Sequence, residues 1–199
     1  TVGIGFLFAP MMHGAMKYAI GPRREIGIRT IFNILGPMTN PARANVQLTG
    51  VFAPELTETL ARVLLRLGMK RTLVVWGEGN MDEMTITGAT RVADAHDGKV
   101  EAYTVTPEEV GLQRAEFAEI RGAATPEESA VQVREVLGGK AGAKLDMVLL
   151  NAGAALMAGG RAATLRQGVD LAREVIASGA ALAKLEQLVA FCKQQAVRG

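Results

Sequence analysis

Residues 46–77, VQLTGVFAPELTETLARVLLRLGMKRTLVVWG, have the pattern of a complete strand–helix–strand unit. Its first segment, residues 46–53, and its last, residues 71–77, are short apolar runs typical of buried strands. Between them, Pro54 at a helix start and Gly68 at a helix end enclose an amphipathic helix. Two strands joined through a helix run parallel. The stretch therefore predicts an α/β fold with a mostly parallel sheet flanked by helices.

The pattern continues on the C-terminal side with strands and then helices. Residues 84–105 predict short strands around the Asp97-Gly98 turn. The sequence TPEE occurs at Thr106 and again at Thr125, each time with the signature of a capping box, and the second predicts a helix through Leu137. The last third of the chain predicts helices that run between glycines. Their many small residues indicate close helix packing.

The N-terminal part is apolar and then rich in turns. Residues 3–9 have the pattern of a buried strand or an apolar loop, and short helical segments follow from Met11. The breakers Gly36-Pro37 and Asn40-Pro41 indicate a linker between two structural layers.

Composition excludes several classes of protein. Of the 199 residues, 49% are hydrophobic and 21% charged, which argues against wholesale disorder. The net charge of +2 is too small, and too evenly spread, to indicate a nucleic-acid partner. Cys192 is the single cysteine, so an intramolecular disulfide is impossible, and a reducing, cytoplasmic location is expected. No apolar run reaches the roughly 18 residues of a membrane span, and the first residues lack the basic start of a signal peptide.

An acidic pair in WGEGNMDEMTITG, residues 76–88, is the strongest local candidate for chemistry. Asp82 and Glu83 follow a strand end, which is where ligands bind in open α/β sheets. Gly77 and Gly79 permit a tight turn that leaves room for a ligand. Adjacent carboxylates raise each other's pKa unless a cation lies beside them, and such oxygen ligands suit Mg²⁺. The alternative is an acidic turn at the surface.

Other polar residues carry weaker local signals. His13 begins a short helix, where a structural role competes with a functional one. Arg23 and Arg24 follow a helix break, and such a pair either faces solvent or clamps a carboxylate or phosphate. His96 lies in a polar turn and is expected to be solvated. Cys192 has no neighbouring base in the sequence, so it receives no nucleophilic role.

The run from Phe6 to Ala42, FLFAPMMHGAMKYAIGPRREIGIRTIFNILGPMTNPA, closely resembles the anthranilate phosphoribosyltransferase family. The Asp-Glu pair after a strand, the segment LLNAGAAL at 149–156 and the glycine-punctuated C-terminal helices agree with it. The resemblance implies transfer of a phosphoribosyl group from phosphoribosyl pyrophosphate to the amine of anthranilate, in tryptophan biosynthesis. It also implies a homodimeric enzyme that uses Mg²⁺, with no nucleic acid or membrane partner.

The same resemblance implies roles for individual residues. Asp82 and Glu83 match the acid pair that binds a Mg²⁺ on the pyrophosphate. Arg23 matches the arginine that engages the anthranilate carboxylate, and His13 and Pro37 match residues that line the anthranilate path. No catalytic residue is assigned. The sequence departs from the family at Trp76, where a histidine is usual, and at Asn80-Met81, where Gly-Leu is usual.

The family's two-domain fold, which nucleoside phosphorylases share, implies a division of the chain. Residues 1–10 are expected as a core strand of the α/β domain, 11–40 as helices of the small helical domain and hinge, and 41–199 as the C-terminal part of the α/β domain. Family members are longer and carry a glycine-rich phosphate loop in their N-terminal part. We therefore expect a C-terminal fragment that is inactive alone. The alternatives are a nucleic-acid-binding relative of the same fold and a pyrimidine nucleoside phosphorylase.

Overall fold

The computed structural model describes residues 1–7, 25 and 35–196. The chain forms two compact units, one of Thr1–Arg43 with Lys184–Gly199 and one of Ala44–Ala183. The second unit begins close to the boundary expected after residue 40, but the C-terminal residues from Lys184 group with the first unit. The assignment of these units to a helical and an α/β domain remains a prediction.

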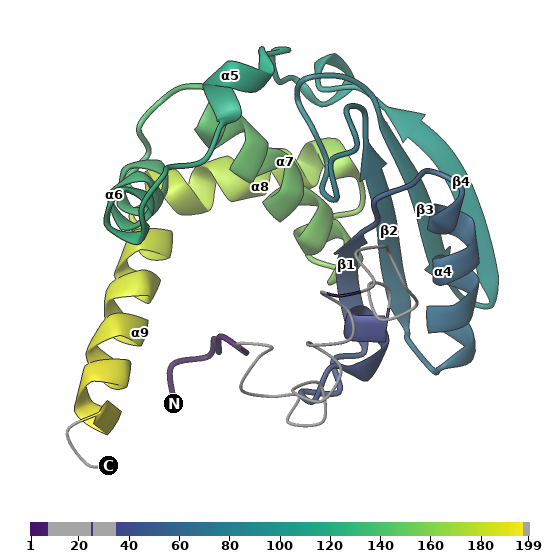
Figure 1. Ribbon diagram of the computed structural model, residues 1–199, viewed down its shortest axis with the longest axis horizontal. Coiled ribbons are helices and arrows are strands. Elements are labelled where there is room, and N and C mark those ends of the chain that lie inside the picture. Colours follow the sequence, from purple (N-terminus) through teal and green to yellow (C-terminus); the bar gives the residue numbers. More distant parts are fainter. Residues whose placement is uncertain (8–24, 26–34, 197–199) are drawn as a thin grey trace. The chain divides into compact units, whose positions relative to one another are not determined.

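The second unit is built on a four-stranded sheet in the order β1-β2-β3-β4 (Figure 1). Its strands are β1 (Val46–Gly50), β2 (Arg71–Gly77), β3 (Thr90–His96) and β4 (Lys99–Val105). The helix α4 (Leu56–Arg66) joins β1 to β2, and these two strands run parallel. The strand–helix–strand unit predicted from residues 46–77 is therefore confirmed.

The sheet is mixed, so its expected parallel character extends only to β1 and β2 among the described strands. The β2–β3 and β3–β4 pairs are antiparallel. The reason is the length of the connections. Asp97 and Gly98, with φ of 49° and 77°, form a two-residue turn that joins β3 to β4 as a hairpin. Residues 78–89 join β2 to β3 without a helix, whereas a parallel crossover normally requires one.

Helices cover both faces of the sheet (Figure 1). Successive side chains of a strand point to opposite faces. On β2, Leu73 and Val75 belong to the main core with helices α7 (Ala143–Ala158) and α8 (Leu165–Ala177). The intervening Val74 is fully buried on the other face, against which α4 packs. The core therefore has two layers, as the α/β class requires.

Helices α7 and α8 approach each other closely at two glycines. A Cβ at Gly168 would overlap the backbone carbonyl of Gly153, and a Cβ at Gly153 would lie 2.6 Å from the backbone nitrogen of Val169. This contact confirms the close helix packing predicted from the small residues of the last third.

The remaining elements of the described residues are short or peripheral. They are the 3₁₀ turns η2 (Gly36–Thr39) and η3 (Glu108–Val110) and the helices α5 (Phe117–Ile120), α6 (Pro126–Leu137) and α9 (Ala180–Ala196). The TPEE sequence at Thr125 forms the predicted capping box of α6. The TPEE sequence at Thr106 yields only η3, because Gly111 adopts a left-handed conformation with φ 74° and ends the turn.

Residues 1–7 contain no strand, and the apolar side chains of Ile4 and Phe6 are exposed. A strand needs a hydrogen-bonded neighbour, and no strand of the described sheet pairs with this segment. The rest of the expected strand, residues 8–10, and most of the expected helices at 11–36 lie outside the described residues. Among the described helices, none is by itself long and apolar enough to cross a membrane; only α8 and α9 taken together reach that length and composition.

Candidate metal centre

The loop of residues 78–89 carries Asp82 and Glu83 at the C-terminal edge of β2. Both residues are exposed, whereas Met84, Thr85 and Ile86, which follow them, are buried. The chain thus turns from solvent into the core directly after Glu83. We refer to residues 78–89 as the acidic loop.

Two glycines allow the acidic loop to lie against the ends of the parallel strands. A Cβ at Gly50, the last residue of β1, would overlap the backbone carbonyl of Asp82 and lie 2.8 Å from its Cα. A Cβ at Gly77 would lie 2.7 Å from the carbonyl oxygen of Glu83. Real Cβ atoms essentially never approach so closely. The position of the acidic pair therefore depends on glycine at both strand ends.

Hydrogen bonds hold both sides of the acidic pair. On the N-terminal side, Met81 and Gly77 exchange two backbone bonds, of 2.9 and 3.0 Å. On the C-terminal side, the backbone N–H of Thr85 donates to the hydroxyl of Thr90 at 3.0 Å. Farther along, the backbone N–H of Ala89 donates to the carboxylate of Glu78 at 3.0 Å. The loop is anchored at its base as well as on each side of Asp82 and Glu83.

A side chain from α7 completes this anchoring. The carboxamide oxygen of Asn151 accepts from the backbone N–H of Met84 at 3.0 Å. Its nitrogen donates to the carbonyl of Met84 at 2.8 Å and to that of Met147 at 3.0 Å. Asn151 therefore joins the acidic loop to the core helix.

The loop conformation also explains one departure from the family pattern. Asn80 has φ 63° and follows Gly79 with φ 85°. Asparagine is among the few residues other than glycine that tolerate this left-handed region. Asn80 therefore preserves the backbone turn where the family usually has glycine. The indole N–H of Trp76, the other departure, is buried and has no hydrogen-bond partner within residues 1–7, 25 and 35–196.

The electrostatics of the pair favour a cation. Partial burial, and then the negative charge of Asp82, raise the pKa of Glu83 above its ordinary value. Among the described residues, neither carboxylate has a hydrogen bond or ion pair through its side chain. No group of three or more histidine, cysteine or acidic side chains gathers in the described part of the chain. Two free carboxylates fit Mg²⁺, which usually takes one or two carboxylates together with phosphate oxygens and water.

Of the other residues singled out in the sequence, His96 is the one that the structure describes in the same unit as this loop. Pro37 is half-buried in η2 and belongs to the first unit, whereas Asp82 and Glu83 belong to the second. His13 and Arg23 lie outside the described residues. His96 bonds to the carboxylate of Asp97 at 2.9 Å in the β3–β4 turn, at the opposite end of the sheet.

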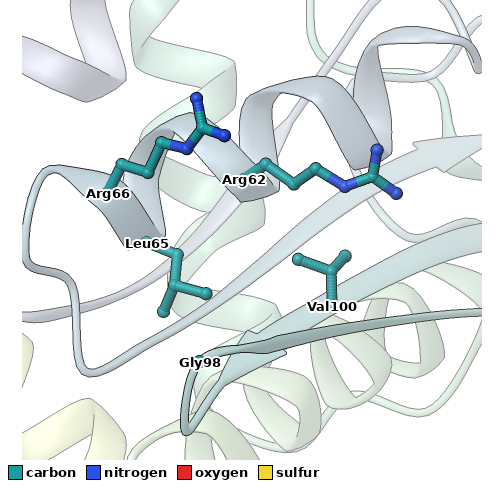
Figure 2. A pocket seen from close by; sticks show the side chains of 5 residues that line it. All are labelled: Arg62, Leu65, Arg66, Gly98 and Val100. Carbon is teal, nitrogen blue, oxygen red and sulfur yellow. The ribbon is translucent and has the colours of Figure 1, made fainter.

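A shallow pocket of about 310 Å³ lies between α4 and the β3–β4 hairpin (Figure 2). Its lining residues are Arg62, Leu65, Arg66, Gly98 and Val100. Gly98 is in the turn after His96, which pairs with the first residue of β2. The pocket thus lies at the other end of β2 from the acidic loop. Arg62 is already ion-paired to Glu58 at 2.8 Å, so we assign no function to this pocket.

Sequence reasoning missed Gly50 and Asn151 as residues that place the acidic pair. Each carries a signal that could have been used. Gly50 interrupts an apolar strand, and glycine in a strand often marks the close approach of another backbone. Asn151 is a polar residue within the apolar run LLNAGAAL, and a buried carboxamide requires hydrogen-bond partners.

The chain resembles known proteins over nearly its whole length. The most similar relatives include the anthranilate phosphoribosyltransferases of Desulfotalea psychrophila, 70% identical over 96% of the chain, and of Moorella thermoacetica, 53% identical over 98%. The chain spans about half the length of these relatives, 55% and 57%.

The chain is also similar to solved structures of anthranilate phosphoribosyltransferases. Anthranilate phosphoribosyltransferase from Thermus thermophilus matches 96% of the chain and 56% of its own length, with a TM-score of 0.89 and 47% identity. The Saccharomyces cerevisiae enzyme in complex with PRPP and Mg matches 91% of the chain and 52% of its own length, with a TM-score of 0.81 and 28% identity. The profile of one family, described as "Glycosyl transferase family, a/b domain", matches residues 1–182. With this match over most of its length, the chain belongs to that glycosyl transferase family.

Proposed function

We propose that the protein to which this chain belongs is an anthranilate phosphoribosyltransferase. It transfers the 5-phosphoribosyl group of phosphoribosyl pyrophosphate to the amine of anthranilate and releases pyrophosphate. The observation that carries the proposal is the exposed pair Asp82 and Glu83, whose side chains have no partner among the described residues and which the backbone holds at the C-terminal end of β2. A relative of that name at 70% identity supports the proposal.

In this proposal Asp82 and Glu83 hold a Mg²⁺ ion through their carboxylate oxygens. When bound, Mg²⁺ neutralises negative charge on the pyrophosphate and makes it a better leaving group. The two carboxylates orient the diphosphate end of the substrate, and the anchored loop keeps them in place before binding. Such preorganisation lowers the cost of assembling the reacting groups. A yeast relative solved with PRPP and Mg supports the choice of ligand.

The anthranilate side of the reaction rests on the resemblance. Arg23 binds the anthranilate carboxylate with the two parallel hydrogen bonds that a guanidinium offers. His13 and Pro37 line the path of the aromatic ring. The aromatic amine is neutral at pH 7 and attacks without a strong base, so positioning supplies most of the catalysis. No residue is proposed as a general base.

The assembly and location belong to the same proposal. We infer a homodimer that acts in the cytoplasm on small molecules, with neither nucleic acid nor membrane as a partner. The net charge of +2 supports the absence of a nucleic-acid partner.

The test uses a chimera in which residues 1–199 replace the matching segment of the Desulfotalea psychrophila relative. Consumption of anthranilate and release of pyrophosphate are measured against Mg²⁺ concentration. We expect turnover that requires Mg²⁺, and a fall in kcat/KM of at least about 100-fold in Asp82→Asn and in Glu83→Gln. A chimera that folds but shows no turnover, while the intact relative is active, would overturn the proposal.

A matched control is available in the β3–β4 turn. Asp97→Asn also removes one carboxylate, and asparagine tolerates the positive φ of that position. Asp97 is 92% exposed and lies at the far end of the sheet. Its kcat/KM is expected to equal that of the unaltered chimera, which separates a local role of the acidic pair from a general effect of charge.

A further inference from the structure

Asn151 uses its whole carboxamide on backbone groups. The side-chain oxygen faces one N–H and the side-chain nitrogen faces two carbonyls, so only one orientation of the amide satisfies all three bonds. The residue is half-buried on α7, beside Leu149, Leu150 and Ala154, which are at most 1% exposed. Met84 itself is buried, so the loss of Asn151 would leave its backbone N–H and carbonyl without this partner in a largely buried position.

Two of the three bonds hold a single residue of the acidic loop. Met84 directly follows Glu83, and its side chain is 1% exposed. Its N–H belongs to the peptide that joins it to Glu83, and its carbonyl belongs to the next peptide. Asn151 therefore fixes the orientation of the peptide that carries Glu83.

The opposite side of the pair is fixed by the two bonds between Met81 and Gly77. Asp82 and Glu83 thus form a two-residue span between two anchors. Their side chains have no hydrogen-bonding partner among the described residues, so the backbone is the part of the pair that hydrogen bonds hold in place. Of the two anchors, the one at Met84 is supplied by a side chain from a different element.

We propose that Asn151 is a positioning residue for the carboxylates of Asp82 and Glu83, and that it acts through the backbone of Met84. This inference rests on the proposed function of the acidic pair. Asn151 touches neither substrate nor cation. Residues that orient metal ligands typically contribute 10–100-fold to metal affinity, so we expect a loss of about tenfold when Asn151 is removed.

Two substitutions separate positioning from charge and from folding. Asn151→Ala removes all three bonds. Asn151→Asp keeps the shape and an acceptor for Met84, but it places a charged oxygen against two carbonyls. A new negative charge on its own would strengthen cation binding. A weaker cation site in Asn151→Asp therefore indicates positioning.

The measurement is the dissociation constant of Mn²⁺ in the presence of pyrophosphate, together with amide hydrogen exchange of residues 81–86, in the chimera. Both Asn151 variants are expected to bind Mn²⁺ about tenfold more weakly, and exchange in this segment should rise relative to β2. Ile176→Ala, a buried position on α8, is the control for lost stability. It should lower stability without changing the Mn²⁺ dissociation constant.

The results distinguish this inference from the proposed function. If both Asn151 variants bind Mn²⁺ as tightly as the unaltered chimera while Asp82→Asn does not, the positioning role is overturned and the proposed function stands. If Asp82→Asn also binds normally, both are overturned. If Ile176→Ala weakens Mn²⁺ binding as much as Asn151→Ala at equal stability, Asn151 is only structural.

Discussion

Replacement of Gly50 by alanine should displace the acidic pair without removing either carboxylate. The new Cβ would overlap the carbonyl of Asp82 and lie 2.8 Å from its Cα. Carbon atoms in ordinary contact are about 3.5 Å apart, so the Cα of Asp82 must retreat by at least about 0.7 Å and its carbonyl by more. Overpacking of this kind typically costs about 1–3 kcal/mol of stability.

The effect on function should exceed the effect on stability. A misplacement of about 1 Å can cost on the order of 100-fold in rate, and we expect that loss in kcat/KM for Gly50→Ala in the chimera. The assay combines Mg²⁺-dependent turnover with unfolding in urea, so the two effects are measured separately. Gly122→Ala is the matched control, because Gly122 has an ordinary φ and nothing within 4 Å of its added Cβ.

A kcat/KM for Gly50→Ala within twofold of that of the unaltered chimera would contradict this prediction. The prediction would also fail if Gly122→Ala produced the same loss. In either case, the close approach of β1 to Asp82 would not determine where the carboxylates lie.

Three further predictions concern stability, measured by urea unfolding. The pKa of Glu83 is raised above its ordinary 4.5, so the ionised form of Glu83 destabilises the fold at neutral pH but not below pH 4.5. Glu83→Gln should therefore stabilise the protein at pH 7, by less than about 1 kcal/mol for so exposed a group. An equal gain in stability at pH 4 would contradict this expectation. The carboxylate of Asp94, which is 6% exposed, bonds to Arg71 at 2.6 and 3.1 Å. Arg71→Met leaves this carboxylate unpaired and should cost about 3 kcal/mol of stability. A loss of stability below about 1 kcal/mol would argue against a buried ion pair. Gly168→Ala should cost about 1–3 kcal/mol through overlap with Gly153, and no change would contradict the close packing of α7 and α8.

The sequence predicts the helices, strands and turns that depend on residues close together in the chain. The strand–helix–strand unit at 46–77 follows from apolar periodicity, and the hairpin at Asp97-Gly98 follows from turn chemistry. The TPEE sequence at Thr125 began a helix because 12 residues of helical pattern follow it. The same four residues at Thr106 gave only a 3₁₀ turn, because Gly111 ends it after Val110.

The site was predictable in part. Ligands in open α/β sheets bind at the carboxyl ends of the strands. This tendency and the family resemblance both point to Asp82 and Glu83. The residues that hold them come from distant parts of the chain, Gly50 in β1 and Asn151 in α7, 67 residues beyond Met84. Such contacts depend on the tertiary packing of the sheet against α7, which a local pattern does not contain. The sheet's mixed character likewise depends on connection lengths as well as on strand patterns.

In the proposed function, Asp82 and Glu83 hold a divalent cation on pyrophosphate. Paramagnetic broadening by Mn²⁺, with pyrophosphate present, tests it most directly when the methionine methyl groups of the chimera are isotopically labelled. Met81 and Met84 flank the acidic pair, whereas Met69 precedes β2 at the other end of the sheet. We expect the signals of Met81 and Met84 to broaden first, and the double substitution Asp82→Asn with Glu83→Gln to abolish the effect. Broadening centred on other methionines of residues 1–199, or broadening that survives both substitutions, would contradict it.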